Sequence, residues 1–122
     1  MAKYRNDFKV EYRGEVTIIH FTAKVLDAIT MENLYRNLLV LAKGLIIKKI
    51  LLDFSEVDCF SSTALCNFVA LNRFVESNKG KLVICSIHED LMEPIRRMHL
   101  SKILTIEKIL DDGLKAFDTN CS

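Results

Sequence analysis

The sequence predicts an α/β domain: a mostly parallel sheet with an N-terminal antiparallel β-hairpin. Two observations predict it, namely the order in which strand-like and helix-like periods alternate along the chain and the short, wholly apolar composition of the later strands. The chain has 122 residues, 50% of them hydrophobic and 27% charged. That composition is typical of a globular domain, and the length suffices to bury a core without metals or disulfides. We expect a single domain over residues 1–122, with its core at about 8–117.

The first two strands are expected at Phe8–Arg13 and Val16–Phe21. In the first, apolar and charged residues alternate with the period of a strand that has one face in water. The second is rich in β-branched residues, and Gly14 between them supplies a turn. The two therefore read as an antiparallel hairpin. His20, on the second strand, is expected to be a partly buried histidine with satisfied hydrogen bonds.

A helix follows, because apolar residues recur every three or four positions from Met31 to Leu45. Thr30 is the candidate N-cap, and Gly44 lies near the expected end. Residues 49–54, KILLDF, then have the composition of a central strand covered on both faces.

The alternation of helix and strand repeats to the end of the chain. The expected elements are a helix with an apolar stripe over 64–75, a strand at 82–87, a helix around 89–98, a strand at 103–106 and a last helix over 110–117. Pro94 requires either a late start or a kink in the third helix. In such sheets, sites form where the strands end, so the candidate edge comprises residues 24–29, 55–62, 88–91 and 108–111.

Charge and composition exclude several function classes. Seventeen Lys and Arg residues against sixteen Asp and Glu leave a net charge of +1, which argues against a general nucleic-acid binder. The apolar runs are far shorter than the roughly 20 residues of a membrane span, and the first residues contain no apolar signal core, so we expect a cytoplasmic protein without membrane insertion. The four glycines are too far apart for a dinucleotide-binding or Walker A loop.

The cysteines have no metal-binding or redox spacing and are expected to be reduced thiols: Cys59, Cys66, Cys85 and Cys121. Cys59 and Cys66 flank a serine-rich loop, and we interpret both as packing residues. Whether either makes that loop redox-sensitive stays open. His88, Glu89 and Asp90 are interpreted as a solvated helix cap rather than as metal ligands.

Three consecutive hydroxyl residues, Ser61, Ser62 and Thr63, precede an apolar helix. One of them would suffice as an N-cap. Three hydroxyls at the positive end of a helix also favour a phosphate, which would change the surface without melting the fold. The cluster is thus a candidate regulatory site.

The stretch 50–65, ILLDFSEVDCFSSTAL, resembles the central signature of STAS domains, the family of bacterial anti-sigma factor antagonists. Asp53 stands nine residues before Ser62, as the strand aspartate does before the regulated serine of the family pattern. The order of elements agrees with the family over roughly 8–117.

The resemblance implies a phosphoprotein of transcription regulation. Ser62 matches the serine that a partner anti-sigma factor, a serine kinase of the GHKL type, phosphorylates, and that a serine phosphatase resets. Asp27 matches an acidic position near that serine, so Asp27, Ser61, Ser62 and Thr63 are the expected partner-binding residues. No catalysis by this chain and no cofactor is implied.

Two residues depart from the family pattern: Ser61 replaces the usual acid and Ala64 the usual glycine. The first departure can shift the N-cap role to Ser61. Some relatives, in transporters and stress-signalling scaffolds, keep the fold without the switch, so a non-switching STAS subunit is the alternative. A third hypothesis is an enzyme or small-ligand sensor built on Asp27, Ser62 and His88.

Overall fold

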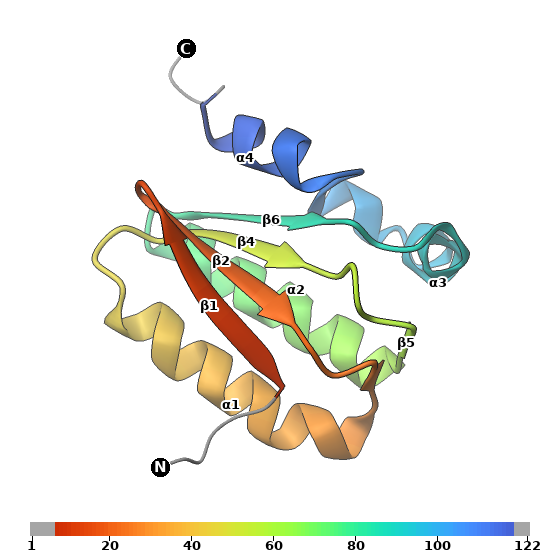
Figure 1. Cartoon of the computed structure of the whole chain (residues 1–122). Coiled ribbons are helices and arrows are strands. Elements are labelled where there is room, and N and C mark those ends of the chain that lie inside the picture. The colour runs from red at the N-terminus through yellow and green to blue at the C-terminus, as the bar shows by residue number, and fades with distance from the viewer. Residues whose placement is uncertain (1–6, 119–122) are drawn as a thin grey trace.

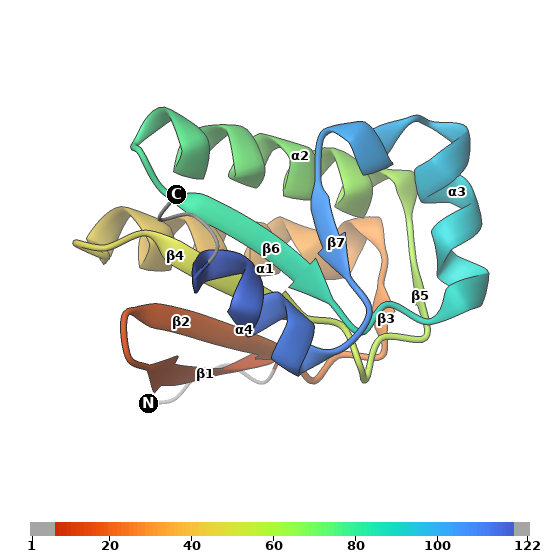
Figure 2. The same ribbon diagram turned by 90° about the horizontal axis from the view of Figure 1, so that it is seen from above.

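The computed structural model describes residues 7–118, which form a five-stranded sheet with helices on both faces (Figures 1 and 2). The strand order is β1-β2-β4-β6-β7, and only the β1–β2 pair is antiparallel. The strands of this sheet are β1 (Phe8–Arg13), β2 (Val16–Phe21), β4 (Lys49–Asp53), β6 (Lys81–Cys85) and β7 (Thr105–Glu107). The predicted fold class, hairpin included, is confirmed.

Helices α1 (Ala28–Gly44) and α2 (Ser62–Ser77) lie on one face of the sheet, and α4 (Leu110–Asp118) crosses the other (Figure 2). Between β6 and β7 the chain forms η1 (Glu89–Leu91), α3 (Met92–Arg97) and η2 (Leu100–Lys102). No helix within residues 7–118 combines the length and the apolar character that a membrane crossing requires.

The core lies on both sides of the sheet because β4 and β6 are covered twice. On the α1–α2 side, the rings of Phe21, Phe54 and Phe68 meet edge to face at centroid distances of 5.1–5.8 Å. On the α4 side, Phe117 packs in a smaller cluster with residues such as Leu51. The near-continuous apolar sequence of residues 50–52 is therefore explained by burial on both faces.

Helix α1 begins earlier than the sequence indicated. Asp27, not Thr30, is its N-cap: Asp27 Oδ1 accepts a hydrogen bond of 2.8 Å from the backbone N–H of Thr30. An aspartate is as good a cap as a threonine, and the pairing of the preceding residues decides which one ends the extended segment.

The third helix starts late, which is one of the two outcomes that Pro94 allowed. A 3-10 turn occupies 89–91, and Pro94 is the third residue of α3, where a backbone N–H has no partner within the helix. The strand predicted at 103–106 is shifted to Thr105–Glu107, because Leu100–Lys102 forms a second 3-10 turn.

Two short strands were not predicted: β3 (Val25–Leu26) and β5 (Cys59–Phe60) pair in parallel outside the main sheet. A two-residue strand carries no recognisable period, so no local pattern marks it. This small sheet positions the candidate site.

Candidate functional site

Helices α1 and α2 begin side by side at the carboxyl edge of the sheet (Figure 2). The register of the β3–β5 pair places Leu26 opposite Phe60, and the next residue of each strand caps a helix. The backbone N–H of Ser61 donates to the carbonyl of Leu26 at 3.0 Å. Asp27 and Ser61, more than thirty positions apart in sequence, are thereby held next to each other.

Ser61 is the N-cap of α2, and its hydroxyl accepts a hydrogen bond of 3.2 Å from the backbone N–H of Ala64. Ser62, the first residue of the helix, is exposed, and so is Thr63. No side chain within residues 7–118 forms a hydrogen bond with the Ser62 hydroxyl. Because Ser61 performs the capping, the Ser62 hydroxyl remains available to react.

Asp27 adds a fixed negative charge to this edge. Hydrogen bonds from Thr30, first from its backbone and then from its hydroxyl, lower the pKa of the Asp27 carboxyl, which is fully exposed. The group is therefore ionised at neutral pH. It lies at the N-terminus of α1, where the helix dipole favours an anion.

Two exposed apolar residues flank Asp27 in the sequence. Val25 is 46% exposed and Ile29 is 79% exposed. Protein–protein interfaces combine an apolar area with a polar border, and this edge offers residues of both kinds. We call this surface the α1–α2 edge; it comprises Val25, Asp27, Ile29, Cys59, Ser62 and Thr63.

The loop that leads into β5 is anchored from three sides. Val57 is fully buried, and the backbone N–H of Ser55 donates to Asp53 Oδ1 at 3.0 Å. His88 Nε2 lies 3.0 Å from the carbonyl oxygen of Ser55. The segment that leads to the exposed serine of α2 is thus fixed to the sheet and to His88 by these contacts.

The enzyme or sensor hypothesis required Asp27, Ser62 and His88 to interact, and they do not. His88 bonds to the backbone of Ser55, and no hydrogen bond within the described residues connects His88, Asp27 or any other base with the Ser62 hydroxyl. Residues 88–90 are exposed, as interpreted, but the His88 side chain does not cap η1. No cluster of three or more His, Cys, Asp or Glu side chains suited to a metal occurs within residues 7–118.

A second polar cluster was not predicted from the sequence. His20 Nδ1 lies 2.7 Å from Asp53 Oδ2, and His20 Nε2 lies 2.8 Å from Glu11 Oε1. The interpretation of His20 as a partly buried, satisfied histidine is confirmed. Asp53 lies opposite His20 on β4, and Glu11 lies two residues along β1 from Lys9, the residue opposite His20. Only strand order and register reveal this relationship.

The interpretation of Cys59 and Cys66 as packing residues is wrong, because both are exposed. Leu65 and Phe68 turn one side of α2 into the core, and Cys66 falls on the other side. Cys85 is the buried thiol, and burial raises its pKa to about 11. Cys121 lies outside the described residues.

The STAS domain model matches residues 7–113 of the chain. Among curated proteins, no sequence matches this chain significantly. Three solved structures show the same fold at low sequence identity. An anti-sigma-factor antagonist (STAS) domain protein from Planctomyces limnophilus is 23% identical, with a TM-score of 0.79, over 93% of this chain and 98% of that one.

The phosphorylated form of SpoIIAA, a Bacillus cell fate determinant, is 13% identical, with a TM-score of 0.66, over 90% of this chain and 98% of that one. The murine anion transporter Slc26a9 is also 13% identical, with a TM-score of 0.75 over 90% of this chain, but the match spans only 19% of the transporter. The family match covers the sheet, α1, α2 and the α1–α2 edge, and the fold agrees with it in strand order and in the hairpin. The chain therefore belongs to the STAS family.

Proposed function

We propose that this protein is a regulatory antagonist that binds an anti-sigma factor of the GHKL serine-kinase type and is switched by phosphorylation of Ser62. A serine phosphatase would reset it, and the cycle would run in the cytoplasm. The α1–α2 edge is the proposed docking surface. The chain performs no catalysis in this scheme, because the kinase and the phosphatase supply the chemistry.

The exposed, unbonded hydroxyl of Ser62 carries the proposal. A kinase needs a hydroxyl that can enter its active site without unfolding the substrate. Ser61 holds the helix cap, so transfer of a phosphoryl group to Ser62 breaks no hydrogen bond of the fold. The first turn of a sixteen-residue helix also tolerates the added negative charge.

The same phosphate would oppose docking. It would add about −1.5 to −2 charges beside the ionised carboxylate of Asp27. A partner that covered the edge would have to desolvate this charge, which costs several kcal/mol when it is left unpaired. Since each 1.4 kcal/mol changes affinity about tenfold, one phosphate is enough to abolish a micromolar complex.

Ser61, which replaces the acid of the family pattern, changes what a partner kinase would recognise at this site. A serine there caps the helix as well as an acid would, but it removes a negative charge next to the phosphorylated residue. Asp27 supplies a negative charge to the same edge from the other helix. The partner kinase would accordingly recognise a surface made by two helices.

Phosphorylation is tested with a purified GHKL-type serine kinase from the source genome, with Mg²⁺ and ATP, and with peptide mass spectrometry. The expected phosphate is on Ser62, absent in Ser62→Ala and retained in the matched variant Thr63→Ala. Ser62→Asp should weaken binding to that kinase by at least about a hundredfold. Phosphate on Thr63 only, or equal binding by the wild type and Ser62→Asp, would overturn the proposal.

A second function, a non-switching STAS subunit of a transporter or signalling scaffold, is favoured by the likeness to part of Slc26a9. In that case the contact surface is constitutive. Substitution of Ser62 by Ala or Asp would then leave the affinity for the copurifying transporter or scaffold protein unchanged, whereas Ile29→Asp would abolish binding if the same edge is used.

A further inference from the structure

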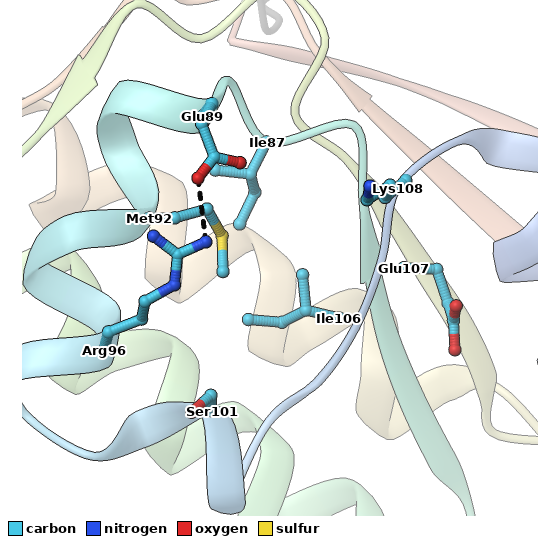
Figure 3. Close-up of a pocket in the computed structure, with 8 residues that line it drawn as sticks. All are labelled: Ile87, Glu89, Met92, Arg96, Ser101, Ile106, Glu107 and Lys108. Atoms are coloured by element: carbon cyan, nitrogen blue, oxygen red, sulfur yellow. Dashed lines mark hydrogen bonds and ion pairs between the residues drawn. The ribbon is translucent and has the colours of Figure 1, made fainter.

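A hollow of about 250 Å³ lies between α3 and the end of β7, outside the α1–α2 edge. Figure 3 shows the residues around it, which come from η1, α3, η2, β7 and the adjoining loops. The lining residues are Ile87, Glu89, Met92, Arg96, Ser101, Ile106, Glu107 and Lys108. None of them takes part in the function proposed above.

The hollow has an apolar floor. Ile87, Met92 and Ile106 are half-buried and pack against the main hydrophobic core. In Figure 3 their side chains lie together between the η1–α3 segment and β7. A small apolar group placed there would cover surface that is now half exposed to water, which is favourable.

Two acidic and two basic residues line the hollow, but their side chains do not all point into it. Arg96 lies 2.8 Å from Glu89, so this pair is neutral overall. Glu107 also lines the hollow, but in Figure 3 its side chain points away from Ile106, on the opposite side of β7. There it lines a second hollow with Lys81 and Lys115.

Lys108 therefore remains as the uncompensated charge. Two positions after Ile106, it lies at the rim of the hollow, and it makes no ion pair with any residue of the described range 7–118. One cation above an apolar floor, with a neutral arginine–glutamate pair at the opposite rim, is complementary to one anionic group attached to an apolar body.

We propose that this hollow binds a small organic carboxylate with a short branched apolar body, about the size of a leucine side chain. The carboxylate meets Lys108, and the apolar body lies on Met92 and Ile106. The size restricts the class, because drug-sized sites are typically about 300–1,000 Å³ and this one holds about 250 Å³. A ligand with so few atoms in an open hollow is expected to bind far below the per-atom ceiling of the best tiny ligands, with a Kd on the order of 1 mM.

The test is a titration of the whole, isotope-labelled protein with isovalerate, followed by the amide chemical shifts in NMR spectra. The shifts are expected to saturate near 1 mM and to concentrate at residues 87, 92, 106 and 108. Isovaleramide has the same shape without the charge, and acetate has the charge without the apolar body. Both are expected to bind at least about tenfold more weakly.

Lys108→Gln should raise the Kd for isovalerate about tenfold, because a charge-assisted hydrogen bond is lost. The matched variant Lys43→Gln removes an exposed lysine at the end of α1 and should leave the Kd unchanged. Both lysines are exposed, so both variants are expected to fold, and their own spectra verify this. Equal binding of isovaleramide, shifts that do not saturate, or an unchanged Kd in Lys108→Gln would each overturn the proposal.

Discussion

His20 on β2 and Asp53 on β4 stand opposite each other in parallel register, with Nδ1 and Oδ2 2.7 Å apart. The second ring nitrogen lies 2.8 Å from a carboxylate oxygen of Glu11 on β1. A neutral imidazole has one N–H and can donate to only one of these carboxylates. Both hydrogen bonds form together only when His20 is protonated, so a cation joins three neighbouring strands.

This arrangement predicts a pH dependence of stability. Burial by itself would lower the pKa of His20, but the hydrogen bonds to Glu11 and then Asp53 outweigh it, and the pKa is raised above its usual 6.5. Because the folded state binds the His20 proton more tightly than the unfolded state does, this proton adds to the free energy of unfolding. The contribution is fully present below about pH 6.5 and is lost as the pH rises through the pKa of His20 in the folded state. The free energy of unfolding should therefore decrease from about pH 6 towards pH 9.

The measurement is urea unfolding at a series of pH values, with His20→Gln as the comparison. Glutamine cannot titrate, so the decrease assigned to His20 should be missing from the variant. A parallel decrease in both proteins would show that another group is responsible.

The adjacent serines Ser61 and Ser62 should differ in their effect on stability. Ser61→Ala removes the cap hydrogen bond to Ala64 and should cost about 1 kcal/mol, or a few degrees in Tm for a domain of this size. Ser62→Ala removes an exposed, unbonded hydroxyl and should stay within about 0.5 kcal/mol of the wild type. Thermal unfolding of the two variants measures this difference. Equal losses of stability in both would mean that Ser62 also caps α2.

Gly80 and Gly44 form a second contrasting pair. A Cβ atom at Gly80 would lie 2.6 Å from Lys48 Cβ and 2.8 Å from Val75 Cγ1, where the chain passes from α2 into β6. Gly80→Ala should therefore cost about 1–3 kcal/mol through overpacking. Gly44 ends α1 with open space around it, and Gly44→Ala should be neutral or stabilise by up to about 1 kcal/mol. Chemical denaturation of both variants provides the check; a stable Gly80→Ala protein would contradict the close approach.

The thiols should react in two classes. Cys59 and Cys66 are exposed, whereas burial raises the pKa of Cys85 to about 11. The thiolate is the reactive form, so iodoacetamide at pH 8 should modify Cys59 and Cys66 in the native protein and Cys85 only after unfolding. Peptide mass spectrometry at successive times resolves the sites, and modification of Cys85 at the rate of Cys66 would show that β6 opens.

The main elements could be predicted because their signals are local. Alternation identified the first strand of the hairpin, its β-branched composition identified the second, and the spacing from Met31 to Leu45 identified α1. The start of α1 could not be placed, since Asp27 and Thr30 are both acceptable caps by type. Pairing of Leu26 with Phe60 selected Asp27, and this contact joins residues far apart in sequence.

The candidate site was only partly visible in the sequence. The hydroxyl cluster and Asp27 were recognised, and the order of parallel strands placed them at one edge. The sequence did not show which residues of the site are exposed. Cys59 and Cys66 illustrate this, because both are neighbours of core residues on their elements and yet face water. Which side of a short strand or of a helix turns inward depends on what packs against it.

The sequence by itself determined the periods of the strands and helices, and with them an alternating parallel sheet whose loops gather at one edge, because backbone geometry couples residue spacing to one face of an element. Only the tertiary structure decided that the caps of α1 and α2 adjoin, that Glu11, His20 and Asp53 form one charged cluster, and that Lys108 stands alone above an apolar hollow. These relationships arise between elements, where register and packing place side chains that no local pattern connects.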